Sequence, residues 1–100
     1  MAQIARSKSY NMNIDKNATI IDVRTPAEFA GQHVPGAINV PLDQLSHRIN
    51  ELKDFAKPIV AYCRSGSRSM MAVSVLKRHG ISEAVNGGGI SDMLSAIKER

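Results

Sequence analysis

The fold is decided by residues 58–80, PIVAYCRSGSRSMMAVSVLKRHG, in which an apolar run passes through a short polar loop into a helix. Residues 59–62 are apolar and include two β-branched side chains after a proline, which predicts a buried strand of a parallel sheet. Residues 69–79 are mostly apolar, with basic side chains in the last turn and Gly80 just beyond it, as the dipole and C-cap preferences of a helix require. The stretch therefore predicts a strand, loop and helix of an α/β fold.

Cys63 is the only cysteine of the chain and stands where this strand meets the loop. Amide groups of a tight loop before a helix point inward and favour an anion, and a thiolate is an anion. A free thiol has a pKa of about 8.5, which a helix N-terminus and the cations Arg64 and Arg68 can lower. The alternative is an inert buried thiol. Two arginines and three serines within the six residues 64–69 argue against it, so we predict a reactive, ionised Cys63.

Several motifs share an order and spacing that resembles the rhodanese, or thiosulfate sulfurtransferase, family. They are the loop C-R-S-G-S-R that begins at Cys63, I-D-V-R at residues 21–24, Glu28-Phe29, H-V-P-G-A-I-N-V-P at residues 33–41, and the glycines 87–89. The resemblance covers most of residues 19–98. It implies an α/β fold with a small, mainly parallel sheet and helices on both faces. The domains expected are a flexible N-terminal segment, residues 1–9, and a single rhodanese domain, residues 10–100.

The resemblance also implies a function. Cys63 would be the nucleophile of a sulfurtransferase that takes sulfane sulfur from thiosulfate or a similar small anionic donor, holds it as a persulfide, and passes it to a thiol or protein acceptor. Neither an organic cofactor nor a metal is implied. The amides and side chains of the loop would bind the substrate; these residues are Arg64, Ser65, Gly66, Ser67, Arg68 and Ser69.

Two other functions remain open. The same fold could serve as a sulfur carrier or regulatory protein-binding module that does not turn over. A rhodanese-fold phosphatase is disfavoured, because those enzymes place five residues between cysteine and arginine. Only four residues separate Cys63 from Arg68 here, and Ser69 stands where the phosphatase arginine would be.

Composition and charge set limits on the class of protein. One hundred residues with 43% hydrophobic and 22% charged side chains predict one globular domain rather than a disordered or fibrous chain. The formal net charge of +4 favours anionic partners, but the basic residues are dispersed and few aromatics accompany them, so we expect no nucleic-acid binding. The sequence has no apolar run long enough for a bilayer and no signal-like start, which predicts a cytoplasmic protein with no membrane partner. Oligomeric state is not predicted.

The remaining elements follow from hydrophobic spacing and turn residues. Tyr10, Met12 and Ile14 alternate as in a strand, and residues 15–17 resemble a turn. The other expected strands are residues 19–23, 38–40 and 82–86, with residues 35–37 and 87–89 as turns. Thr25 should cap a short helix, residues 42–55 should form one amphipathic helix or two shorter ones, and residues 90–100 should form the last helix.

Other polar residues are assigned to structure rather than chemistry. We expect Asp22, Arg24 and Glu28 to pair with one another or with nearby backbone, since buried charges require partners. The three histidines, His33, His47 and His79, share no metal-ligand spacing.

Overall fold

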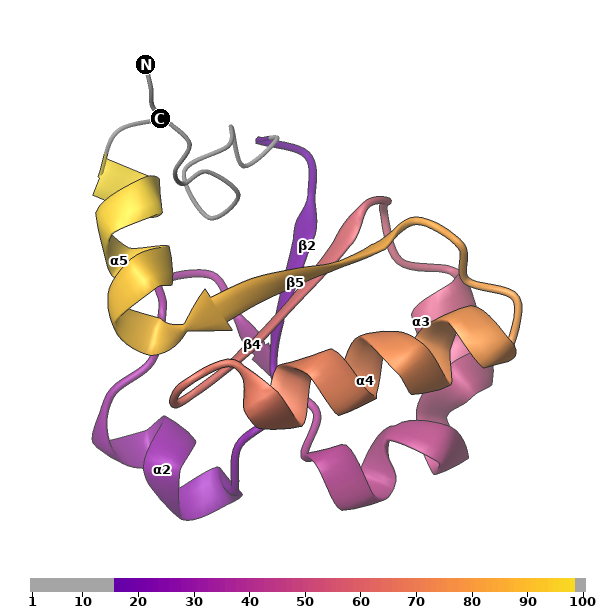
Figure 1. The fold of residues 1–100 in the computed structure, drawn as a ribbon, viewed down its shortest axis with the longest axis horizontal. Coiled ribbons are helices and arrows are strands. Elements are labelled where there is room, and N and C mark those ends of the chain that lie inside the picture. Colours follow the sequence, from indigo (N-terminus) through magenta and orange to yellow (C-terminus); the bar gives the residue numbers. More distant parts are fainter. Residues whose placement is uncertain (1–15, 99–100) are drawn as a thin grey trace.

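The structure is a computed structural model that describes residues 16–98 (Figure 1). The predicted flexible segment 1–9 and the predicted strand at residues 10–14 lie outside the described residues. The turn expected at residues 15–17 is present at Lys16 and Asn17.

Four parallel strands form the sheet in the order β3-β2-β4-β5. Their bounds are β2 Thr19–Asp22, β3 Ile38–Asn39, β4 Ile59–Cys63 and β5 Ala84–Gly89. The central pair, β2 and β4, places Asp22 beside Tyr62, so the residues that follow both strands emerge at the same edge of the sheet. This edge carries Cys63.

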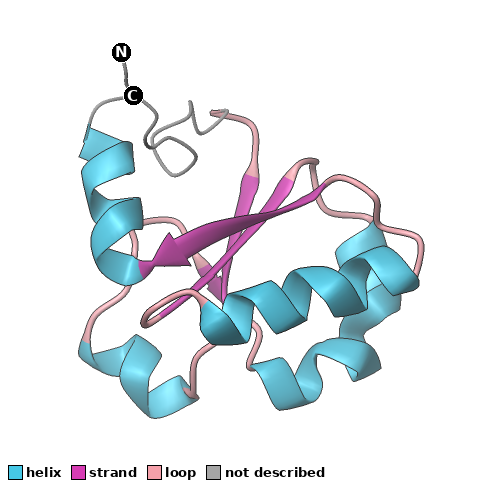
Figure 2. Ribbon diagram, in the orientation of Figure 1, coloured by secondary structure: helices cyan, strands magenta, loops and turns pink. Residues whose placement is uncertain are grey.

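Helices cover both faces of the sheet, as predicted (Figure 2). One face is covered by a 3-10 helix, η1 Leu42–Arg48, with α3 Ile49–Lys53 and α4 Ser67–Arg78. The other is covered by α5 Ile90–Lys98. The short helix α2 Pro26–Gly31 lies beyond the carboxyl end of β2. None of the helices among residues 16–98 is long and apolar enough to cross a membrane.

The two cores follow from the alternation of side chains along each strand. Ala61 and Cys63 of β4 point into the larger core, where Leu76 of α4 is fully buried. Val60 and Tyr62, the intervening residues, point into the smaller core with Met93 of α5. The strand β4 is buried along its whole length, so it can position Cys63 firmly.

Two local predictions are confirmed. Thr25 caps α2 in a reciprocal capping box: its hydroxyl accepts from the backbone N–H of Glu28, and the Glu28 carboxylate accepts from the backbone N–H of Thr25. Pro26 occupies the first turn. The amphipathic segment 42–55 is split in two, as η1 and α3.

Several boundaries differ from the predicted ones. Strands β2 and β3 each end one residue earlier than predicted, and β5 begins at Ala84 rather than at residue 82. Helix α4 begins at Ser67 rather than at residue 69, because Gly66, with φ of 105°, serves as its N-cap. The glycines 87–89 are not a turn but the end of β5, opposite a register shift between Ala61 and Tyr62. Close packing explains Gly87 and Gly89: a Cβ on Gly87 would lie 2.6 Å from Met93 Sδ, and one on Gly89 would lie 2.6 Å from the Arg64 carbonyl oxygen. Gly88 has a positive φ of 87°, which favours glycine.

Candidate active site

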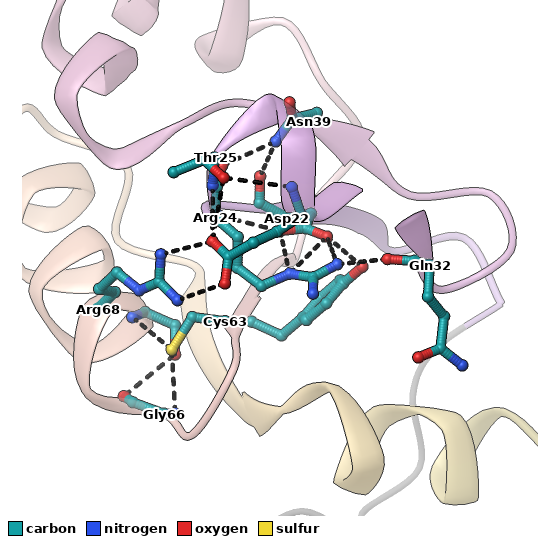
Figure 3. A network of polar contacts seen from close by, with 11 residues as sticks. Asp22, Arg24, Thr25, Gln32, Asn39, Cys63, Gly66 and Arg68 are labelled. Carbon is teal, nitrogen blue, oxygen red and sulfur yellow. Dashed lines mark hydrogen bonds and ion pairs between the residues drawn. The ribbon is translucent and has the colours of Figure 1, made fainter. Parts of the chain in front are cut away.

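The thiol of Cys63 lies at the junction of β4 and α4, enclosed by the loop that follows it (Figure 3). Its residue is only 1% exposed. The backbone N–H of Gly66 donates to Sγ at 3.0 Å, and that of Ser69 at 3.4 Å. The Ser69 hydroxyl lies 3.5 Å from Sγ. Several donors therefore converge on one sulfur atom, as expected for a site that stabilises a negative charge.

The environment lowers the pKa of the Cys63 thiol below its ordinary value. Burial acts in the opposite direction and raises it, but the hydroxyl and amide of Ser69 outweigh this effect together with the amides of Ser65 and Gly66. The sequence predicts a pKa lowered by the start of the helix and by Arg64 and Arg68. In the structure, the hydrogen bonds from the loop and from Ser69 lower the pKa of the thiol, because these donors contact the sulfur directly.

The predicted substrate-binding residues surround Sγ in different ways. Gly66 and Ser69 are buried against it, Arg68 is half-buried, and the others are exposed, namely Arg64, Ser65 and Ser67. The structure thus brings the amides of the loop together around the thiol. It leaves the Arg64 side chain without a hydrogen bond or ion pair within residues 16–98.

Arg68 has a partner that the sequence did not predict. Its guanidinium donates to both carboxylate oxygens of Glu28, at 2.9 and 3.1 Å (Figure 3). Arg68 also lowers the pKa of Glu28 to about 2. Because Glu28 also closes the capping box with Thr25, the pair connects the start of α2 to the start of α4.

A hollow of about 260 Å³ opens beside Arg68. Its walls come from the carboxyl end of β2 and the start of η1, and the lining residues are Val23, Arg24, Thr25, Pro41, Leu42, Asp43 and Arg68. The hollow lies at the edge of the sheet where ligands of open α/β folds collect.

Asp22 and Arg24 are structural, as predicted, and form a buried ion pair. The guanidinium donates to the carboxylate at 2.7 to 3.1 Å and also to the Gln32 carbonyl. The Tyr62 hydroxyl donates to Asp22 at 2.7 Å and accepts from the Val34 N–H. Burial raises the pKa of Tyr62. The network holds β2, β4 and the segment before β3 together. Glu28 accepts from the nearby backbone N–H of Thr25, as predicted, and has a second partner that was not predicted, Arg68 of a distant helix.

No group of three or more potential metal ligands occurs among histidine, cysteine, aspartate and glutamate side chains in the part of the chain that the structure describes.

A protein-family model described as a rhodanese-like domain matches residues 6–96 of the chain. The chain belongs to the rhodanese-like family.

Individual members of this family show how far the likeness extends. The thiosulfate sulfurtransferase PspE of Escherichia coli strain K12 is 36% identical over 74 residues, which are 73% of this chain and 71% of PspE. The putative sulfur carrier protein YrkF of Bacillus subtilis strain 168 is 36% identical over 72 residues, or 72% of this chain and 38% of YrkF. A solved structure titled "rhodanese with anions from E. coli" superposes with a TM-score of 0.69 at 36% identity, covering 75% of this chain and 89% of that one.

Rhodaneses often carry a tryptophan at the position of Met93. Here Met93 is 1% exposed and packs in the smaller core beside Gly87. The flexible thioether fills the space in this rhodanese fold, on the opposite face of the sheet from Cys63.

Asn86 is a site residue that the sequence analysis missed. From β5, its side chain contacts both Ser69 and the Gly66 carbonyl. The only signal in the sequence was a polar residue within the last strand of a rhodanese domain, beside the glycines 87–89, and a polar side chain on an edge strand is normally assigned to solvent.

Proposed function

We propose that this rhodanese-like protein is a sulfurtransferase that carries sulfur as a persulfide of Cys63, with thiosulfate or a similar small anion as donor. The observation that supports this most directly is the buried Sγ, which receives hydrogen bonds from Gly66 and Ser69 at the N-terminus of α4. Such a site lowers the energy of the Cys63 thiolate and of the persulfide anion formed from it.

The first half-reaction forms the persulfide. The Sγ thiolate attacks the outer sulfur of thiosulfate, a new S–S bond forms, and the bond between the two thiosulfate sulfurs breaks. The electron pair of that bond leaves with sulfite. The amides of the loop then face the terminal, negatively charged sulfur of the persulfide.

The second half-reaction regenerates the thiol site. An acceptor thiolate, or cyanide in an assay, attacks the outer sulfur, and Sγ leaves as a thiolate with the electron pair of the S–S bond. The donors around Sγ stabilise the charge that develops on the leaving sulfur. No metal or organic cofactor takes part in either step of the proposal.

The donor would be oriented by the loop residues Arg64, Ser65, Gly66, Ser67, Arg68 and Ser69. Arg64 is exposed, so its guanidinium can meet an incoming anion first. Arg68 borders the adjacent hollow, and its bond to Glu28 must be shared or replaced when oxyanions bind.

Intact mass tests the proposal. After brief incubation with thiosulfate, the wild-type protein should gain one sulfur, about 32 Da, and lose it on a cyanide wash. The Cys63→Ser variant should gain nothing and should show no cyanide-dependent transfer while remaining folded. A folded wild-type protein that stays unloaded with thiosulfate and with other sulfane donors would contradict the proposal, as would undiminished transfer by Cys63→Ser.

A sulfur carrier or regulatory binding module is the second candidate. The pairing of the Arg68 guanidinium with Glu28 favours this function. If Arg68 must leave Glu28 to bind the sulfur donor, the enzyme would turn over slowly. YrkF, the relative titled a putative sulfur carrier, is consistent with this function. A carrier would load one sulfur from a donor and release it only to a partner, so repeated turnover with thiosulfate and cyanide distinguishes the two.

The phosphatase function is third, because the loop between Cys63 and Arg68 is one residue shorter than phosphatases require. A cytoplasmic location and the absence of nucleic-acid and membrane partners stay predictions from the sequence.

A further inference from the structure

The hydroxyl of Ser69 is fully buried and has a single proton, but several acceptors lie within reach. Asn86 Oδ1 is the nearest, at 2.7 Å, and the Gly66 carbonyl oxygen is 3.1 Å away. Cys63 Sγ and the Gly88 carbonyl oxygen both lie at 3.5 Å. One proton cannot serve all four, so the acceptors compete for it.

The orientation of the Asn86 amide decides what faces Ser69. The Gly88 N–H donates to Oδ1 at 2.9 Å, and Nδ2 donates to the Gly66 carbonyl at 3.2 Å. Reversing the amide would place an N–H₂ against the Gly88 N–H and an oxygen against the Gly66 carbonyl. Two backbone groups of opposite type therefore fix Oδ1 toward the Ser69 hydroxyl, which must donate to it.

The charge on Sγ then determines where the proton points. An uncharged thiol or thioether sulfur is a weak acceptor, and the amide oxygen at 2.7 Å is the better one. An ionised sulfur is a strong acceptor, and a hydroxyl can turn toward it by rotation about its C–O bond, with no bond broken. We propose that Asn86 is a positioning residue: its Oδ1 accepts the hydrogen bond of the Ser69 hydroxyl whenever Cys63 Sγ is uncharged, and the hydroxyl turns to donate to Sγ when Sγ is ionised.

The inference rests on the proposed function and refines it. In sulfur transfer, Sγ is charged before it attacks the donor and again as it leaves the persulfide, and it is uncharged while it carries the outer sulfur. As the charge on Sγ changes, the Ser69 hydroxyl would alternate between Sγ and Asn86 Oδ1 as its acceptor. This buried hydroxyl would therefore have a hydrogen-bond partner at every stage. Asn86 would therefore compete with the thiolate and keep its pKa higher than Ser69 alone would set it.

Thiolate absorbance as a function of pH tests the inference without any sulfur donor. Cys63 is the only cysteine, so the difference spectrum against Cys63→Ser reports one thiol. The measurement is made on wild type, Asn86→Leu, Ser69→Ala and the double variant. At a pH below the midpoint, Asn86→Leu should raise the thiolate fraction about threefold, and Ser69→Ala should lower it by a similar factor.

The decisive quantity is the effect of Asn86→Leu in the two backgrounds. We expect the threefold increase to disappear when Ser69 is already alanine. An equal effect in both backgrounds, or no increase in the wild-type background, would overturn the inference. A change in packing alone would alter thermal stability but would not depend on the Ser69 hydroxyl. If Asn86→Leu does not fold, Asn86→Ala replaces it, and the same increase in the thiolate fraction is expected.

Charged groups around the loop do not differ between these variants. They are Arg64 in the loop, Arg68 of α4 with its partner Glu28 of α2, and Asp92 of α5, which accepts from the Gly89 N–H. Asn39→Ala is the matched control, because the Asn39 amide donates to the carbonyls of Asp22 and Arg24 and not to the cysteine loop. It should leave the titration of Cys63 unchanged. Failure to form a persulfide would refute the proposed function. The titration of Cys63 uses no sulfur donor, so its outcome does not depend on that result.

Discussion

At the scale of single residues, the position of Arg68 has consequences for both stability and donor binding. Its guanidinium donates to both carboxylate oxygens of Glu28, and Arg68 also lines the hollow at the carboxyl end of β2. The pair is partly exposed, with side-chain exposures of 35% for Arg68 and 28% for Glu28. Water therefore screens it, and its contribution to stability should be small compared with its effect on an anionic ligand.

Replacing Arg68 by alanine should separate these two roles. We expect the KM for thiosulfate to rise about tenfold, the usual scale for losing a charged hydrogen bond to substrate. The free energy of unfolding should fall by less than about 1 kcal/mol. Steady-state kinetics and urea denaturation measure the two. Arg48→Ala is the control, since Arg48 forms a similar surface pair with Glu51 and does not line the hollow beside Arg68. An unchanged KM in Arg68→Ala would remove Arg68 from donor binding.

The pH dependence of stability gives a second test of the pair. Hydrogen bonds from Arg68, and to a smaller extent from Thr25, lower the pKa of Glu28 from 4.5 to about 2, so the folded state binds this proton less readily than the unfolded state. The resulting stabilisation is complete above the unfolded pKa and is lost as pH falls toward 2. Glu28→Gln should therefore be less stable than wild type at neutral pH, and the difference should vanish near pH 2. Urea denaturation over that range would show it, and a constant difference would contradict the assigned pair.

At the scale of elements, the end of β5 controls the shape of the cysteine loop. Gly89 lies against the backbone of Arg64 and Ser65, and an added Cβ would lie 2.6 Å from the Arg64 carbonyl oxygen. A backbone atom cannot turn away as a flexible side chain can. The strand and the loop must therefore move apart if this glycine gains a side chain.

Gly89→Ala adds only one methyl group, but it should lower both stability and sulfur-transfer activity. We expect a loss of about 1–3 kcal/mol in stability from overpacking. Sulfur transfer should fall between roughly tenfold and a hundredfold, because the donors around Sγ shift. Gly31→Ala is the matched control: no atom lies within 4 Å of its added Cβ, and its backbone needs no glycine. Its stability should stay within about 0.5 kcal/mol of wild type. Full activity in Gly89→Ala would show that the loop tolerates displacement.

At the scale of the whole molecule, a buried ion pair at the end of β2 is joined to β4 by the hydroxyl of Tyr62. Asp22 is fully buried and accepts from Arg24 and from the Tyr62 hydroxyl, which in turn accepts from Val34. A domain of this size is stabilised by only about 5–15 kcal/mol in total. Removing one charge of a buried pair leaves the other charge buried without a partner, which destabilises the fold more than replacing both residues by apolar ones would.

Asp22→Asn should consequently be among the most destabilising single changes. We expect a loss of about 3–5 kcal/mol in the free energy of unfolding, measured by chemical denaturation. Asp43→Asn, on the exposed side of η1, serves as control and should change stability by less than about 0.5 kcal/mol. A small effect of Asp22→Asn would show that the Arg24 guanidinium is stabilised by other partners, such as the Gln32 carbonyl.

Features that depend on neighbours along the chain could be predicted from the amino-acid sequence. The strand before Cys63, the helix after it, the capping box of Thr25 and the helical character of residues 42–55 are all local consequences of side-chain spacing and cap chemistry, whereas the number of helices in residues 42–55 stayed open. The motifs around Cys63 also indicated the family, and the family model confirmed it.

Contacts between side chains that are distant in the sequence follow from the folded arrangement of the strands and could not be predicted. Glu28 and Arg68 are 40 positions apart, and Ser69 and Asn86 are 17 apart. Neither contact has a local signal, because each arises from the strand order that places the ends of β2, β4 and β5 at one edge of the sheet. The sequence predicts a turn at the glycines 87–89 for the same reason. Their conformational freedom can be read from the sequence, but the Met93 side chain beside Gly87 and the Arg64 backbone beside Gly89 come from other elements.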